Sequence, residues 1–262
     1  MKKWEISFII GGLDLIEQKS FDGVNIDGVK FQNSTYDEIV GTIILESHNT
    51  ADAIEESKYF INKALAKFCF ASGMEAYTDL FKYYIADLTN DSEKEKPQWK
   101  FGGSFPEEQS RVPRKDTGFT LTKIKSLKSE KEPTLDLALA YYQLGQYKNP
   151  LRIESFFSSM TVLIRDLWTK ELPKKDEVTT AFLKEKIKLI LKDRNPTIFH
   201  ESEFYNQWKE YYVDERCSIA HGRGSKIIDP RTIHEYDYMT RNINSWNRDV
   251  IYYYVDNFQN SK

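Results

Sequence analysis

The sequence predicts an α+β protein, in which a mixed, β-rich N-terminal unit is followed by an up-and-down helical bundle. Before Pro133, apolar residues mostly alternate with polar ones, which is the pattern of half-buried strands. After Pro133 they recur at spacings of three and four, as in helices packed lengthwise on one another. A charged run from Lys125 to Pro133 separates the two patterns. We therefore expect two domains, at residues 1–132 and 133–262.

The composition is that of a folded globular protein. The 262 residues are 40% hydrophobic and 14% aromatic, which is ample material for a core. The net charge of -3 provides no overall field for nucleic acid, so a site for a polyanion has to be a local basic patch. Cys69 and Cys217 form no CxxC or Cys/His cluster, and we expect neither a disulfide nor a zinc site. No leader pattern and no apolar run of roughly 18 residues is found, so we expect a cytoplasmic protein without a membrane partner.

Strands and one long helix are expected in the N-terminal unit. Alternating apolar residues predict a strand over Lys3 to Ile16 and another over Ile39 to Leu45, with a hairpin between them that is punctuated by Gly23 and Gly28. Asn49-Thr50 then offers an N-cap to an amphipathic helix.

The remainder of this unit has a less regular pattern. From Ser72 to Leu88 the spacing suits a helix whereas the aromatic content suits a sheet, and both remain open. Trp99 to Phe105 and Gly118 to Leu127 alternate like strands. Basic residues in and on both sides of the second of these fit either a phosphate-facing strand and loop or a solvated sheet face: Arg111, Arg114, Lys115, Lys123, Lys125 and Lys128.

The C-terminal unit reads as helical throughout. Phe204, Trp208 and Tyr212 are four residues apart and form one helical stripe. We take Trp208 and Trp246 as core residues, because both fall on such stripes. The other expected helices cover Leu135 to Gln146, Ile153 to Leu167, Asp176 to Asn195, and His234 to Phe258.

The stretch Arg216-Cys-Ser-Ile-Ala-His-Gly222 carries the clearest candidate chemistry. An Arg is permanently cationic and its planar fork of donors suits phosphate, whereas a His near neutral pH can give or take a proton. In a straight α-helix, residues five apart point about 140° away from each other. Arg216 and His221 therefore need a local break, or a second copy of the motif across a dimer interface, to meet at one phosphate.

This stretch resembles the Arg-x4-6-His motif of HEPN domains, and in particular the "Arg-Asn-x-Ile-Ala-His" variant, as in the large bacterial HEPN proteins. The resemblance covers roughly Pro133 to Phe258. It implies a helical bundle that pairs into a homodimer, and metal-independent cleavage of RNA by the ribose 2′-hydroxyl. Arg216 would hold the phosphate and His221 would act as general acid or base. Cys217 replaces a polar residue found in many active members, so the alternative is a non-catalytic module for dimerisation or for nucleotide or RNA binding.

Other interpretations of these residues remain open. Arg223 is either a further phosphate contact or an ordinary exposed Arg, and Cys217 is a weak candidate for substrate contact. Arg216 has a structural alternative in an ion pair with Glu210, Asp214 or Glu215, and His221 in a helix C-cap. His48, His200 and His234 are taken as structural or exposed. We expect no metal and no cofactor. The sequence does not indicate the RNA substrate, the ligand of the N-terminal unit, or whether the setting is defence, stress response, a toxin pair or metabolism.

Overall fold

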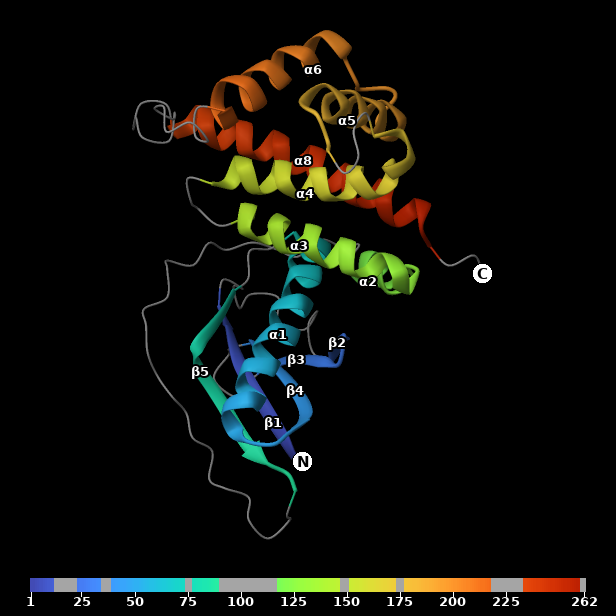
Figure 1. Ribbon diagram of the computed structural model, residues 1–262. Helices are drawn as coiled ribbons and strands as arrows, with labels where there is room; N and C mark the ends of the chain where they lie inside the picture. Colours follow the sequence, from blue (N-terminus) through green and yellow to red (C-terminus); the bar gives the residue numbers. More distant parts are fainter. Residues whose placement is uncertain are drawn as a thin grey trace. The chain divides into compact units, whose positions relative to one another are not determined.

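The computed structural model describes residues 1–11, 23–33, 39–73, 77–89, 117–146, 151–172, 177–217 and 233–259 (Figure 1). An antiparallel sheet with one long helix is followed by a helical C-terminal region, which confirms the α+β class. The chain divides into two compact units, Met1–Leu121 and Thr122–Lys262. The division falls in a short helix, whereas the sequence placed it between residues 132 and 133.

The sheet of the first unit has five strands in the order β2-β3-β4-β1-β5, with antiparallel pairing at every described junction. In β1, which lies between β4 and β5, Ile6 is opposite Ile43 of β4 and Ile85 of β5, so the three side chains share one face. Within the segment that the sequence left open between Ser72 and Leu88, residues Tyr77–Asp87 form the edge strand β5. The strands are β1 Lys2–Gly11, β2 Val24–Ile26, β3 Val29–Asn33, β4 Ile39–Ser47 and β5 Tyr77–Asp87.

Helix α1, Thr50–Ser72, packs on the face of the sheet that carries Ile6, and its predicted N-cap is confirmed. The Asn49 side chain accepts a hydrogen bond from the Asp52 N–H, which satisfies one of the free donors of the first turn. Ile61 and Phe68 are among the core residues that α1 contributes.

The hairpin between β2 and β3 is made by Asp27-Gly28, with φ of 51° and 84°. A two-residue turn with both φ angles positive matches the twist of the flanking strands and favours Asp-Gly. The Asp27 carboxylate lies 2.6 Å from Lys67 Nζ of α1, and Lys67 is only 7% exposed. This ion pair ties the turn to the helix.

The prediction of a strand over Gly118 to Leu127 is wrong. Most of this segment lies in helix α2, Thr117–Lys125. Leu121 and Ile124 are buried at helical spacing, whereas Phe119 is 65% exposed. The phosphate-facing strand is thereby excluded for this part of the basic cluster, and Lys123 pairs with Asp256 at 2.8 Å. Residues 99–105 and the cluster's Arg111, Arg114 and Lys115 lie outside the described residues.

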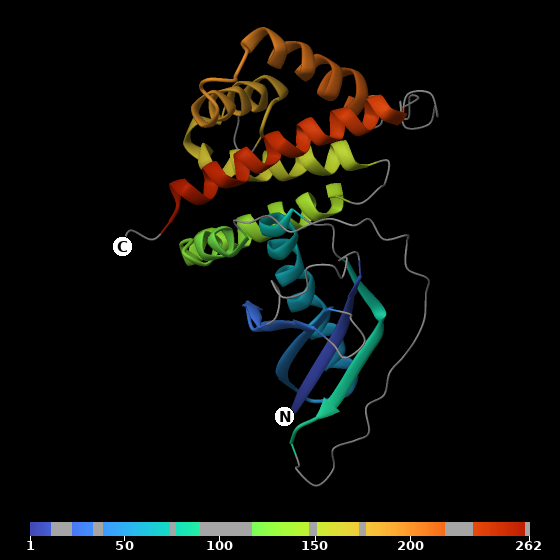
Figure 2. The same cartoon turned by 180° about the vertical axis from the view of Figure 1, so that it is seen from behind.

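The second unit is a helical bundle in which the C-terminal helix α8 packs against α3, α4 and α5 (Figures 1 and 2). No β-strand is found among the described residues beyond Asp87. None of the helices in the described segments is long and apolar enough to cross a bilayer. The third expected helix begins at Thr180, with Thr179 as its N-cap, rather than at Asp176. The helices are α3 Glu132–Gln146, α4 Arg152–Leu167, α5 Thr180–Arg194, α6 Glu201–Trp208 and α8 Ile233–Asn257, with 3₁₀ turns at Ser129–Lys131 and Thr169–Glu171.

Close packing of α3 on α4 depends on Gly145, which lies within α3. A Cβ atom at this position would lie 2.5 Å from the buried ring of Phe156. The absence of a side chain therefore lets the ring of Phe156 approach the α3 backbone.

Candidate functional site

The helix that leads into the Arg/His stretch widens before it reaches Arg216. Residues Lys209–Arg216 continue α6 as a π-helix, and the Cys217 N–H donates to the Tyr212 carbonyl, five residues earlier. π-Helical turns are rare, and they occur frequently at functional sites. The helix type therefore changes where the motif begins, whereas a break between Arg216 and His221 would fall beyond Cys217, outside the described residues.

The predicted stripe of Phe204, Trp208 and Tyr212 continues to Arg216. The rings of Trp208 and Tyr212 stack with centroids 4.5 Å apart and an interplanar angle of 12°. Phe157 of α4 meets the Tyr212 ring edge-on at 4.8 Å. Trp208 and Trp246 are both buried, as expected for core residues. The stack fixes the phenol against which Arg216 lies.

Three hydrogen bonds hold the Arg216 guanidinium. Nε and Nη2 donate to the two carboxylate oxygens of Glu154, at 2.7 and 2.9 Å, and Nη1 donates to the Tyr212 hydroxyl at 3.0 Å. The guanidinium carbon also lies 4.8 Å from the centre of the Tyr212 ring, a cation–π contact. Burial by itself disfavours the charged form, but the hydrogen bond and the charge of Glu154 outweigh it and raise the pKa of Arg216. Arg216 is therefore a fixed cation.

Glu154, in the first turn of α4, was not expected as the partner of Arg216. The sequence suggested Glu210, Asp214 or Glu215, and the structure corrects this choice. The carboxylate comes from a residue 62 positions earlier, and it reaches Arg216 because α4 packs beside the π-helix. No local pattern around Glu154 indicates this pairing, although the spacing of four between Tyr212 and Arg216 does predict their contact.

Arg216 keeps hydrogen-bonding capacity beyond these contacts. A guanidinium has five N–H donors, and the described residues accept from three of them. The Arg216 side chain is 28% exposed, and the other two donors, one on each terminal nitrogen, have no acceptor among the described residues. Arg216 is thus oriented by the protein and partly exposed.

Of the other predicted site residues, Cys217 alone lies within the described segments. Cys217 is a free, partly buried thiol next to Arg216. His221 and Arg223 lie outside the described residues, so the predicted meeting of Arg216 with His221 remains a prediction. Within the described segments, no three His, Cys, Asp or Glu side chains gather closely enough to hold a metal ion.

Comparisons with models of protein families, with curated proteins and with solved structures find no match for this chain.

Proposed function

We propose that the C-terminal bundle is an HEPN-like endoribonuclease domain that cuts RNA without a metal ion and works as a homodimer. The observation that carries the proposal is the state of Arg216. Its guanidinium is oriented by Glu154 and Tyr212, yet it retains two donors and is partly exposed. The resemblance of Arg216-Cys-Ser-Ile-Ala-His-Gly222 to the HEPN motif supports the same function.

The reaction needs one cation and one proton-transferring group. The ribose 2′-oxygen bonds to the adjacent phosphorus while the bond from phosphorus to the 5′-oxygen breaks, leaving a 2′,3′-cyclic phosphate and a free 5′-hydroxyl. Arg216 would donate to the phosphate oxygens as negative charge grows on them. His221 would take the proton of the 2′-hydroxyl or give one to the departing 5′-oxygen, a contribution of about 10² to 10⁴-fold.

The direct test is cleavage of an unstructured, end-labelled RNA oligonucleotide in EDTA between pH 6 and 8. We expect products with 2′,3′-cyclic phosphate ends, and a loss of about 100-fold or more in His221→Ala. Arg216→Lys should lose activity as well, because an ammonium keeps the charge but not the planar fork. Exposed residues of the same types provide matched controls, and His48→Ala and Arg241→Ala should cleave at the wild-type rate. A wild-type protein that is inactive throughout this range would refute the nuclease proposal.

A second candidate is a non-catalytic module that binds RNA or a nucleotide. It is favoured by the ion pair itself, because the Glu154 carboxylate cancels the charge that Arg216 would otherwise offer to a transition state. The replacement Cys217 also fits this alternative. The acidic net charge of -3 agrees with a site that binds one anionic group rather than a long polyanion.

Glu154→Gln separates the two candidates, because the amide keeps the shape of the side chain but removes its charge. In a nuclease, Glu154 is a positioning residue: the variant should bind RNA more tightly and cleave it more slowly, with the fall appearing in kcat. In a binding module the variant should bind RNA more tightly, with a salt dependence steeper by about one counterion, and no cleavage should be seen in either protein. Sedimentation velocity on the same samples tests the homodimer.

A further inference from the structure

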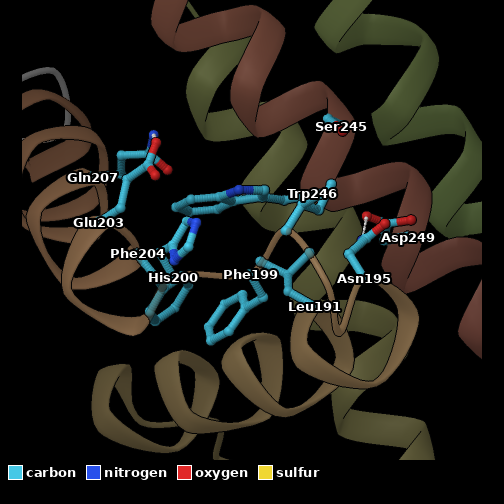
Figure 3. A pocket seen from close by; sticks show the side chains of 11 residues that line it. Leu191, Asn195, Phe199, His200, Glu203, Phe204, Gln207, Ser245, Trp246 and Asp249 are labelled. Carbon is cyan, nitrogen blue, oxygen red and sulfur yellow. Dashed lines mark hydrogen bonds between the residues drawn. The ribbon is translucent and has the colours of Figure 1, made fainter.

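A hollow of about 260 Å³ opens in the second unit where α6 and α8 meet the segment that follows α5 (Figure 3). It is distinct in its residues from the Arg216 site, since neither Arg216 nor Glu154 lines it. His200, at the start of α6, is exposed, as the sequence analysis allowed, and it lines this pocket. Figure 3 shows His200 beside the indole of Trp246.

Aromatic rings from three segments form the apolar wall of the pocket. Phe204 of α6 lies 5.3 Å from Trp246 of α8 and 5.9 Å from Phe199 of the preceding loop, measured between ring centres. Trp246 is in turn 5.6 Å from Tyr211 in the π-helix. Because Trp246 and Phe204 are both largely buried, their rings are held in place before any ligand arrives.

The polar part of the lining has two carboxylates, those of Asp249 and Glu203, and one imidazole, that of His200. Asp249 accepts hydrogen bonds from Asn195 at 2.9 Å and from its ion-pair partner Arg194 at 3.4 Å. Glu203 accepts a hydrogen bond from Gln207 at 3.1 Å, and no cation in the described part of the chain pairs with it. Among the described residues that line the pocket there is no Lys or Arg. In Figure 3 the Glu203 and Gln207 side chains are seen on one side of Trp246, and Asn195 and Asp249 on the other.

We propose that this pocket binds a small organic cation, an ammonium ion carried on a single ring or a short chain. Aromatic faces attract cations through their quadrupole, and a carboxylate without a competing cation adds a direct electrostatic attraction. The same carboxylates disfavour phosphates and other anions. The volume lies just below the roughly 300 to 1,000 Å³ typical of sites for drug-sized ligands, which favours a ligand with one ring over a nucleotide.

This proposal does not depend on whether the bundle cuts RNA. Its test is calorimetric titration of the full chain with benzyltrimethylammonium, with benzyl alcohol as the neutral analogue and phenyl phosphate as the anionic one. We expect the ammonium compound to bind with a Kd between about 10 μM and 1 mM. Benzyl alcohol should bind at least tenfold more weakly, and phenyl phosphate should show no binding.

Two charge-removing variants in helix α6 test whether the Glu203 carboxylate attracts the ammonium ion. Glu203→Gln should weaken ammonium binding by about tenfold, because it removes the unpaired carboxylate charge from the pocket. Glu201→Gln removes an equal charge two residues away, from a side chain that pairs with Lys188 at 3.3 Å and does not line the pocket, and it should leave the affinity unchanged. Equal loss in the two variants, equal affinity for benzyl alcohol, or no ammonium binding at about 10 mM would each overturn the proposal.

Discussion

The two units of the chain hold their inward-facing charges in different ways. In the first unit, Lys67 lies against the carboxylate of Asp27 at 2.6 Å. In the second, such a pair is combined with a tyrosine hydroxyl: Arg216 contacts both Glu154 and Tyr212. Likewise, Asp166 accepts from Lys131 at 2.9 Å and from the Tyr254 hydroxyl at 2.7 Å.

This difference bears on which charge is available to a ligand. A carboxylate cancels the charge that it orients, whereas a phenol orients a charged group without cancelling it. Lys67 is 7% exposed and its partner fixes a tight turn, so the pair serves the fold. Arg216 is 28% exposed and is held by both Glu154 and Tyr212, so its guanidinium keeps a defined orientation while remaining partly exposed. The same residue chemistry therefore has a structural use in one unit and a candidate functional use in the other.

The largest effect is expected from breaking the ion pair of the first unit. Asp27→Asn keeps a residue that tolerates the positive φ of the turn but leaves Lys67 without this carboxylate. We expect the free energy of unfolding to fall by about 3 kcal/mol, the low end for a broken buried pair because Asp27 is itself partly exposed. Urea denaturation measures the change.

Two companion variants make this result interpretable. Adding Lys67→Met to Asp27→Asn should recover most of the loss, because the buried cation is removed as well. Glu55→Gln breaks the exposed pair with Lys58, and it should cost at most about 0.5 kcal/mol. If Asp27→Asn costs no more than Glu55→Gln, the Lys67 pair does not stabilise the fold.

Where the sequence predicted elements correctly, their apolar pattern and their end signals agreed. Alternation in β1 and the cap at Asn49 are examples. The prediction failed at α2 because Phe119 was counted with Leu121 on one apolar face. In the structure Phe119 is exposed, and the buried positions are Leu121 and Ile124, three residues apart. One large exposed ring in a nine-residue helix was enough to imitate a strand.

The candidate site could be predicted only as far as residues close in sequence determine it. The stripe that ends at Arg216 follows from a spacing of four, and the structure continues it with Tyr212 under the guanidinium. Glu154 could not be predicted, because its contact depends on how two helices pack rather than on either sequence pattern. The π-helix was equally inaccessible, since no residue pattern in Lys209–Arg216 distinguishes hydrogen bonds to i−5 from those to i−4.

A smaller effect is expected from removing the phenol that distinguishes the second unit. Tyr212→Phe keeps the ring stacked on Trp208 and packed against Phe157. It deletes the hydroxyl that accepts from Arg216 and that also lies 3.4 Å from the Thr180 hydroxyl. We expect a loss of about 1 kcal/mol in unfolding free energy, measured by urea denaturation. In the nuclease, RNA cleavage should also slow, because the guanidinium is less well oriented.

Tyr205→Phe is the matched control for this variant. Its hydroxyl accepts from Lys188 at 2.9 Å, but the side chain is 37% exposed, so water can replace the lost contact. We expect less than about 0.5 kcal/mol. Equal costs for Tyr205→Phe and Tyr212→Phe would show that the phenol beside Arg216 has no special role.

The smallest expected effect is on the pH dependence of the unfolding free energy. One carboxylate in each unit contributes to it, and the two contributions have opposite signs. The hydrogen bond from Lys2 at 2.7 Å, aided by those from Thr89, lowers the pKa of Asp87 to about 2. In the second unit, burial raises the pKa of Asp249 against the opposing contacts of Asn195 and Arg194. Asp87 therefore favours the folded state when ionised, whereas Asp249 favours it when protonated.

Each carboxylate should make the unfolding free energy change with pH, and its Asn variant should lack that contribution. The stabilisation by Asp87 is complete above the unfolded-state pKa of about 3.9 and is lost as the pH falls toward 2, so wild type should lose more stability than Asp87→Asn over that interval. For Asp249 the sign reverses: wild type should lose stability relative to Asp249→Asn as the pH rises from about 3.9 through the raised pKa of the folded state. Urea denaturation between pH 2 and 7 measures both differences. Slopes of the same sign at the two positions would contradict this assignment, because a carboxylate held by hydrogen bonds at the surface and one held in a desolvated setting must respond to protons in opposite directions.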